Sequence, residues 1–253
     1  MFHNTVRIFT AGVEMNARMK IFVLLSVSMI FAVFATRTST RLLKLKPLDT
    51  KSWRACSRST SGANGLHDAL RYLQVKCGYH VNGVLDVGAN NGALSSDLKA
   101  FLECELKQRD TNFFLMEGND AHVHSLRASG FPYHIGLLAE DERNVTYYKV
   151  TNLSDPRNTG NSIFKEATFR ENEAVEARTS TVDKVIEAAG AGPFNFMKID
   201  VQGAEVLVLK GSVNTMRYVD IVATEASIQN YNEGGADFFE LHSVMNELGF
   251  AVY

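Results

Sequence analysis

The chain is poor in cysteine and proline and carries almost no net charge. Its three cysteines are too few and too widely spaced to predict a disulfide scaffold or a zinc knuckle. A formal net charge of −2 gives no excess of Lys and Arg for phosphate contacts, so we expect no nucleic-acid partner. With 253 residues, 45% of them hydrophobic, the chain suits one α/β domain with a short extension.

Long hydrophobic runs are also scarce, and the longest lies near the N-terminus. It covers Ile21–Ala35, with basic residues on both sides. A membrane-spanning helix needs about 20 apolar residues, so this shorter run predicts a signal peptide or a short signal anchor. We therefore divide the chain into a tail (1–20), the signal segment (21–36), a basic Ser/Thr-rich stem (37–65) and a folded domain (66–253).

This division predicts contact with a membrane through the apolar segment, and a location in the secretory pathway, in the lumen of the endoplasmic reticulum or Golgi. More Lys and Arg residues follow the run closely than precede it, which is unusual for an anchor whose C-terminal side is lumenal. Targeting to another organelle and a cytosolic location remain alternatives. Glycosylation sequons at Asn144 and Asn152 would be used only in the secretory pathway.

The folded domain is organised around a glycine-rich turn. The segment Val84–Gly92 reads VLDVGANNG, which predicts a buried strand, a tight turn and a helix from about Ala93. Gly88 allows a sharp turn of the backbone, and Gly92 allows a ligand to approach the main chain. The N–H groups at the start of the helix are available to a polar or anionic ligand group.

Three predicted strands end in an acidic residue. Glu117 ends the strand after the turn, where a carboxylate can accept hydrogen bonds from both hydroxyls of a ribose. Asp200 and Glu225 end two later strands. Because the carboxyl ends of parallel strands meet at one edge of a sheet, we expect these acids to converge beside the glycine turn.

Between these strands the pattern is less regular. Tyr133–Ala139 predicts a third strand, and Val145–Val150 predicts an added strand beside it. Ser154–Arg178 is polar and aperiodic, and a loop of this length is usually functional or mobile. A last helix is expected over Asp237–Leu248, with a strand beginning over Phe250–Tyr253.

From Leu66 to Tyr253 the chain resembles the FkbM family of S-adenosylmethionine-dependent methyltransferases. The segments that carry the resemblance are VLDVGANNG (84–92), FFLMEG (113–118), NTGNS (158–162), TSTVD (179–183), MKIDVQGAEVLVLKG (197–211) and IVATEAS (221–227). It implies a Rossmann-like methyltransferase fold, α/β with a mostly parallel sheet and helices on both faces. The family usually has Glu where this chain has Gln202, and its last antiparallel strand is not found after Tyr253.

The resemblance also implies roles for individual residues. The turn would hold the methionine part of S-adenosylmethionine, Glu117 would hold the ribose, and Asp200 would face the methyl-transfer centre. The candidate cofactor-binding residues are Asp86, Gly88, Ala89, Asn90, Gly92, Glu117 and Gly118. The candidate catalytic residues are Asp200, as general base for a hydroxyl acceptor, and Glu225.

The function expected is O-methylation of a hydroxyl on a glycan or small metabolite. A divalent metal held by Asp200 and Glu225 is an alternative, because oxygen ligands suit magnesium. Glu205 is expected to orient the turn or to pair with Lys198. Two rival functions remain open: a membrane-tethered binding module without catalysis, and an NAD-dependent oxidoreductase, although the turn lacks the full G-x-G-x-x-G spacing.

Overall fold

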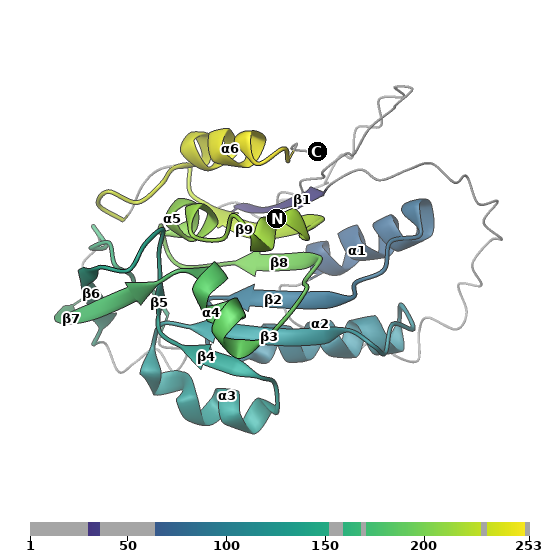
Figure 1. Cartoon of the computed structure of the whole chain (residues 1–253), viewed down its shortest axis with the longest axis horizontal. Helices are drawn as coiled ribbons and strands as arrows, with labels where there is room; N and C mark the ends of the chain where they lie inside the picture. The colour runs from purple at the N-terminus through teal and green to yellow at the C-terminus, as the bar shows by residue number, and fades with distance from the viewer. Residues whose placement is uncertain (1–29, 36–63, 152–158, 168–170, 229–231, 251–253) are drawn as a thin grey trace, which may run out of the picture.

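A computed structural model describes residues 30–35, 64–151, 159–167, 171–228 and 232–250 of the chain. Its centre is a six-stranded sheet in the order β1-β9-β8-β2-β3-β4 (Figure 1). The strands are β1 (Ile30–Ala35), β2 (Gly83–Val87), β3 (Asn112–Glu117), β4 (Tyr133–Ile135), β8 (Phe196–Ile199) and β9 (Ile221–Ala226). The pairs from β4 across to β9 are parallel, and β1 runs antiparallel to β9. The predicted mostly parallel α/β sheet is confirmed.

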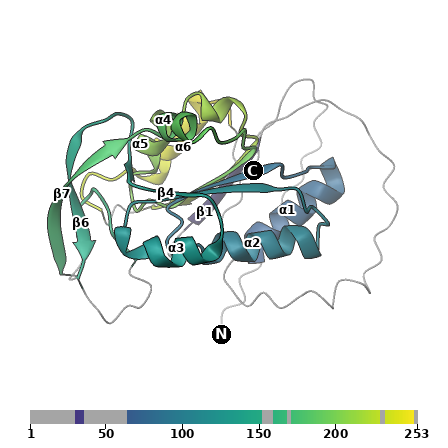
Figure 2. The same cartoon turned by 60° about the horizontal axis from the view of Figure 1, so that its bottom comes forward.

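Helices cover both faces of this sheet (Figure 2). One face carries α1 (Asn64–Cys77), α2 (Ala93–Cys104) and α3 (Val123–Ser129), preceded by the short 3-10 helix η2 (Asp120–His122). The other face carries α4 (Val182–Ala189), α5 (Glu205–Lys210) and α6 (Phe238–Glu247), with the 3-10 helix η3 (Thr215–Arg217). Two apolar cores result, one on each face of the sheet.

The central strands are apolar on both faces because helices cover both. Leu85 and Val87 of β2 belong to the core under α4, α5 and α6, and Val84 belongs to the core under α1, α2 and α3. All five residues of β2 are buried. This double burial explains why the strands read as continuous apolar runs, and it fixes the edge at which their polar ends emerge.

A second, three-stranded sheet lies beyond the carboxyl ends of the central strands (Figure 1). It consists of β5 (Leu137–Leu138), β7 (Asn172–Ser180) and β6 (Asn144–Val150), with β6 and β7 paired antiparallel. The strand predicted over Tyr133–Ala139 is therefore divided at Gly136 between two sheets. An added Cβ at Gly136 would lie 2.7 Å from the end of the His134 ring, so a larger residue here would require that ring to move.

Two other predictions for this region were wrong. The strand over Val145–Val150 does not extend the main sheet, since its partner is β7. The end of the predicted loop Ser154–Arg178 is strand β7. Most of β7 is exposed or half-buried, so its side chains give no apolar alternation that would have marked it as a strand.

The apolar run Ile21–Ala35 is described only in its last six residues, which form β1. The register pairs Ile30 with Ala226 and Ala35 with Ile221. The described part of the predicted signal segment (21–36) is thus a strand: a short run rich in Ile, Val and Phe suits a strand as well as a helix, and periodicity does not separate the two. Among the described residues, no helix is long and apolar enough to span a bilayer.

At the C-terminus, α6 confirms the last predicted helix. The strand expected over Phe250–Tyr253 lies, apart from Phe250, outside the described residues. Within the described residues, the antiparallel position beside β9 is taken by β1, from the other end of the chain.

Candidate functional site

The turn after β2 is held to the neighbouring strand β3 by its backbone. The N–H groups of Gly88 and Ala89 both donate to the Met116 carbonyl, at 2.8 and 3.0 Å. Gly88, Asn90 and Gly92 all have positive φ, at 77°, 51° and 78°. Two of these are glycines, and asparagine tolerates this conformation better than other side chains. The sequence at these three positions thus matches the backbone of the turn.

Gly88 is required by a neighbouring strand end. A Cβ at this position would lie 1.8 Å from the carbonyl oxygen of Asp200. The Asp200 N–H donates to Val87 O at 2.9 Å. The close approach at Gly88 is therefore one between the ends of β2 and β8. It places Asp200 directly beside the turn.

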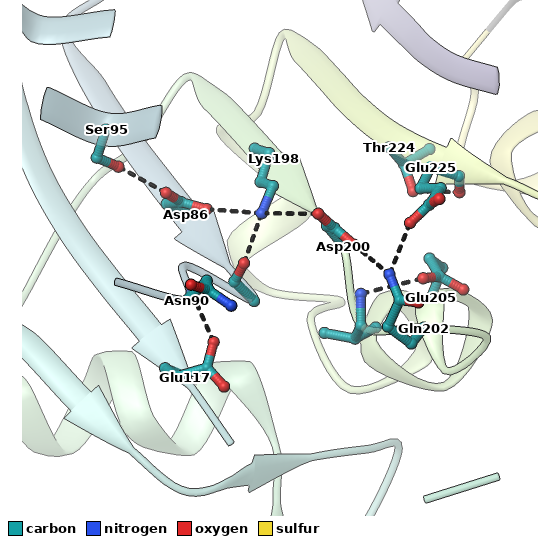
Figure 3. A network of polar contacts seen from close by, with 12 residues as sticks. Asp86, Asn90, Ser95, Glu117, Lys198, Asp200, Gln202, Glu205, Thr224 and Glu225 are labelled. Atoms are coloured by element: carbon teal, nitrogen blue, oxygen red, sulfur yellow. Dashed lines mark hydrogen bonds and ion pairs between the residues drawn. The ribbon is translucent and has the colours of Figure 1, made fainter. Parts of the chain in front are cut away.

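Glu117, at the end of β3, lies on the other side of the turn. Its Oε2 accepts the Asn90 N–H at 2.7 Å (Figure 3), and its Oε1 accepts the Asn119 N–H, also at 2.7 Å. Each carboxylate oxygen can accept a second hydrogen bond. Glu117 is thus fixed by two backbone donors and keeps acceptor capacity toward the pocket.

A buried lysine joins the turn to Asp200. Lys198 Nζ donates to the Gly88 carbonyl at 2.6 Å and lies 3.2 Å from Asp86 Oδ1 and 3.5 Å from Asp200 Oδ2 (Figure 3). Burial acts to lower the pKa of Lys198, but the two carboxylates outweigh it and raise that pKa above its ordinary value. Lys198 is therefore the cation that compensates the buried Asp86 and the half-buried Asp200.

Gln202 connects the two candidate catalytic acids. Its Nε2 donates to Asp200 Oδ1 and to Glu225 Oε2, both at 2.8 Å (Figure 3). The residue itself has a left-handed backbone, with φ 54°. Its carbonyl accepts hydrogen bonds from Ser162 Oγ and Asn232 Nδ2, both at 2.7 Å. Two loops thus hold this unusual backbone conformation in place.

The two acids have opposite protonation preferences. Burial acts to raise the pKa of Asp200, but the charge of Lys198 and hydrogen bonds to Asp200 lower it below its ordinary value. Burial and the negative charge of Asp200 raise the pKa of Glu225 to about 9. At neutral pH Asp200 is therefore a carboxylate and Glu225 a neutral acid. Such a split is common at catalytic sites.

Glu205 orients the turn after β8. Its Oε1 accepts the N–H groups of Val201 and Gly203, at 3.1 and 3.2 Å. Burial raises its pKa to about 7, although these backbone hydrogen bonds act to lower it. Of the two roles expected for Glu205, the structure shows turn orientation, and Lys198 pairs with Asp86 and Asp200.

These residues surround one pocket at the carboxyl edge of the sheet. Its walls include the turn, the ends of β3 and β8, Tyr147 of β6 and the segment Thr159–Ile163. That segment is attached to β6, since Val150 N–H donates to Asn161 Oδ1 at 2.7 Å. Burial raises the pKa of the Tyr147 hydroxyl, and the charge of Glu117 adds to the rise. This hydroxyl is therefore a neutral donor or acceptor at physiological pH.

The structure brings some of the candidate residues to this pocket and not others. Among the candidates, the residues that line it are Gly88, Asn90, Glu117, Gly118 and Asp200. The other four lie behind it. Asp86 accepts Ser95 Oγ at 2.6 Å, Ala89 packs into the core, and Glu225 is reached through Gln202. A Cβ on Gly92 would contact core side chains of Leu115 and Leu126.

The start of α2 also differs from the expected anion site. Asn91 Oδ1 accepts the Ala93 N–H at 3.0 Å, so a side chain of the turn already satisfies a donor of the first helical turn. Ligand contacts from this region would come from the turn before the helix.

Sequence reasoning missed the roles of Lys198, Gln202 and Tyr147. The sequence signal for Lys198 was a charged residue inside an otherwise apolar strand, since a buried lysine requires an acidic partner. No sequence pattern identifies the bridge made by Gln202, because it depends on a left-handed backbone. In the part of the chain that the structure describes, no group of three or more His, Cys, Asp or Glu residues could hold a metal ion.

Comparison with known proteins assigns the family. Residues 86–252 match the methyltransferase FkbM domain, which is more than half of the chain and includes all the candidate residues. A solved structure of methyltransferase FkbM from Methylobacillus flagellatus KT is similar, with 16% identity and a TM-score of 0.41. The match covers 65% of this chain and 37% of that one, so the chain spans well under half of that protein. No curated protein matches the chain. The match to the domain shows that the chain belongs to the FkbM methyltransferase family.

Proposed function

We propose that the chain transfers a methyl group from S-adenosylmethionine to a hydroxyl group of a glycan or small metabolite. The observation that carries the proposal is the placement of two carboxylates on either side of one glycine turn, both lining the same pocket. Glu117 is suited to bind the donor, and Asp200 is suited to take a proton from the acceptor. Membership of the family supports methyl transfer as the reaction.

The residues at the pocket fit S-adenosylmethionine. A ribose has two adjacent hydroxyl donors, and the two oxygens of Glu117 each have one backbone donor and room for another. Tyr147 and Leu138 provide apolar surface within the same pocket. When bound, the donor supplies an electrophilic methyl group on sulfur.

In the mechanism that we propose, Asp200 receives the proton of the acceptor hydroxyl. Its lowered pKa keeps it ionised at neutral pH, as a general base must be. Lys198 and Gln202 fix the carboxylate through contacts to its two oxygens. Glu225, which is protonated at neutral pH, adds no second negative charge beside it. The main contribution of the protein is to place the acceptor oxygen in line with the methyl carbon.

A radiolabelled methyl-transfer assay against candidate glycans and small hydroxyl compounds tests this function. Asp200→Asn keeps the size of the side chain and removes its basicity. We expect turnover to fall by roughly 10²–10⁴-fold, with little change in donor affinity. Glu233→Gln, an exposed acid-to-amide change, is the matched control and should keep full activity. An Asp200→Asn protein that turns over at the original rate would rule out Asp200 as the base.

A further inference from the structure

The space between Asp200 and Glu225 is filled by the amide group of Gln202. Its Nε2 lies 2.8 Å from one oxygen of each acid. An NH₂ group has two hydrogens, so it can donate one to each carboxyl group. Glu225 is protonated at neutral pH, so the two acids carry one negative charge between them. The neutral amide of Gln202 donates to both.

The position of this amide is fixed by the backbone. The backbone of Gln202 is left-handed, a conformation that residues other than Gly, Asn and Asp rarely adopt. The residue is held by hydrogen bonds from Ser162 and Asn232 to its carbonyl oxygen. Ser162 and Asn232 come from separate loops, and neither of them contacts the side-chain amide of Gln202 through these bonds. The backbone of Gln202 is therefore fixed by contacts that do not involve the acids, and Figure 3 shows its side-chain amide between the two acids.

One oxygen at this position has no partner. Glu225 is only 4% exposed, and its Oε1 accepts no hydrogen bond among the described residues. Its Oε2 is used by Gln202. A buried carboxyl group with a free oxygen beside a second acid has the oxygen donors that Mg²⁺ and Mn²⁺ prefer. The side-chain nitrogen of Gln202 occupies the position between the two acids that a cation would take.

We propose that the Gln202 amide takes the place of a bridging divalent cation, so that the acids at this site are joined without a metal. The second part of the proposal is that Gln202→Glu converts the site into one for Mn²⁺ or Mg²⁺. In that variant the two hydrogens are lost, and a third acid joins the Asp200 carboxylate and the protonated Glu225. A divalent cation that displaces the Glu225 proton would have three acidic side chains as oxygen ligands. Gln202 is thus a positioning residue for Asp200. Its effect on methyl transfer rests on the function proposed above, whereas cation binding does not.

Calorimetric titration with MnCl₂ tests the proposal on the full chain. We expect Gln202→Glu to bind one Mn²⁺ at least ~10-fold more tightly than the unchanged protein, because the number of charged ligands sets the affinity. Gln74→Glu is the matched control. It makes the same charge change in α1, where the Gln74 amide contacts Leu106 O at 3.1 Å, far from the pocket (Figure 1). Adding Glu225→Gln to Gln202→Glu should abolish the Mn²⁺ binding.

The titration can overturn the proposal in two ways. Tight Mn²⁺ binding by the unchanged protein that Glu225→Gln removes would show that the amide does not exclude a cation. A folded Gln202→Glu protein that binds Mn²⁺ no better than Gln74→Glu would show that the site cannot hold one. If Gln202→Glu does not fold, Gln202→Ala replaces it, since this change also opens the position. Gln202→Ala should bind Mn²⁺ more tightly than the unchanged protein, and equal binding would contradict the proposal.

A second measurement connects the site to methyl transfer. Turnover by the unchanged protein should be the same with and without a chelator, whereas Gln202→Glu should lose turnover in the chelator and recover it with Mn²⁺. Loss of turnover by the unchanged protein in the chelator would contradict the proposal. If the unchanged protein neither binds nor uses S-adenosylmethionine, the proposed function fails, and the MnCl₂ titration still decides the role of Gln202.

Discussion

Glu117 and Asp200 lie on either side of the same turn, but the protein holds them in different ways. Glu117 accepts two backbone N–H groups and has no cation within ion-pairing distance among the described contacts. Asp200 is held by side chains, with Lys198 on one oxygen and Gln202 on the other. Backbone donors fix geometry and leave the charge available to a ligand, whereas side-chain partners also set the protonation state. The first arrangement suits binding and the second suits proton transfer.

Removing the cation on the Asp200 side should have the largest effect on stability. Lys198→Met leaves the buried Asp86 and the half-buried Asp200 without their partner, and breaking a buried ion pair such as Lys198–Asp86 costs about 3–5 kcal/mol. Thermal melts measure the loss. Lys99→Met breaks the Lys99–Glu103 pair on the surface of α2, where the two side chains are 42% and 36% exposed, and should cost less than ~1 kcal/mol. Equal melting temperatures for the two variants would show that Lys198 does not hold the acids in place.

A second change tests how closely the turn approaches Asp200. Gly88 and Gly78 both have positive φ, at 77° and 65°. A Cβ on Gly78 meets nothing within 4 Å, whereas one on Gly88 meets the Asp200 carbonyl. Gly78→Ala should therefore cost only the conformational penalty, about 1–2 kcal/mol. Gly88→Ala should cost more in chemical denaturation and should also weaken donor binding. Similar costs for both would mean that the two strand ends are not in contact.

The raised pKa of Glu225 predicts how stability depends on pH. The folded chain keeps this proton to about pH 9, whereas the unfolded chain releases it near the ordinary value of 4.5. Between these values the folded state binds more protons, so the free energy of unfolding falls as pH rises, by at most ~1.4 kcal/mol per pH unit. Glu225→Gln should flatten this fall between pH 5 and 9 in melts, and the exposed control Glu233→Gln should leave it unchanged. An unchanged slope in Glu225→Gln would place the pKa of Glu225 near its ordinary value.

The smallest effect is expected at the far edge of the sheet. Removing residues 1–35 deletes β1 and exposes the edge of β9, the strand that carries Glu225. The lost backbone pairing should cost at least about 1 kcal/mol, or roughly 2–4 °C in melting temperature. A stretch that serves only as a signal peptide would leave the melting temperature unchanged when removed. The melt therefore distinguishes the observed strand from the signal segment expected from the sequence.

The sequence predicted the parts of the fold that are buried on both faces. Strands β2, β3, β8 and β9 read as apolar runs with polar ends, and all four lie in the main sheet near the predicted positions. The sheet of β5, β6 and β7 was not predicted, because β7 is largely exposed and Gly136 divides an apparently continuous run. Periodicity reports burial, so an exposed hairpin gives little signal.

The candidate site, like the fold, could be predicted from the sequence only in part. The placement of Glu117 and Asp200 beside the turn follows from a parallel sheet and could be predicted. The protonation of Glu225 and the bridge through Gln202 could not, since they depend on a left-handed backbone held by Ser162 and Asn232. These contacts join residues far apart in the sequence, and no local pattern encodes them.

Donor-binding calorimetry on Glu117→Gln and Asp200→Asn tests the division of roles most directly. Both changes replace a carboxylate by an amide of the same shape, so each is the matched control of the other. Glu117→Gln should weaken S-adenosylmethionine binding by about 1–3 kcal/mol, because charge-assisted hydrogen bonds to the ribose are lost. Asp200→Asn should bind the donor with nearly unchanged affinity. Equal loss in both variants, or a loss confined to Asp200→Asn, would contradict the assignment of binding to one acid and proton transfer to the other.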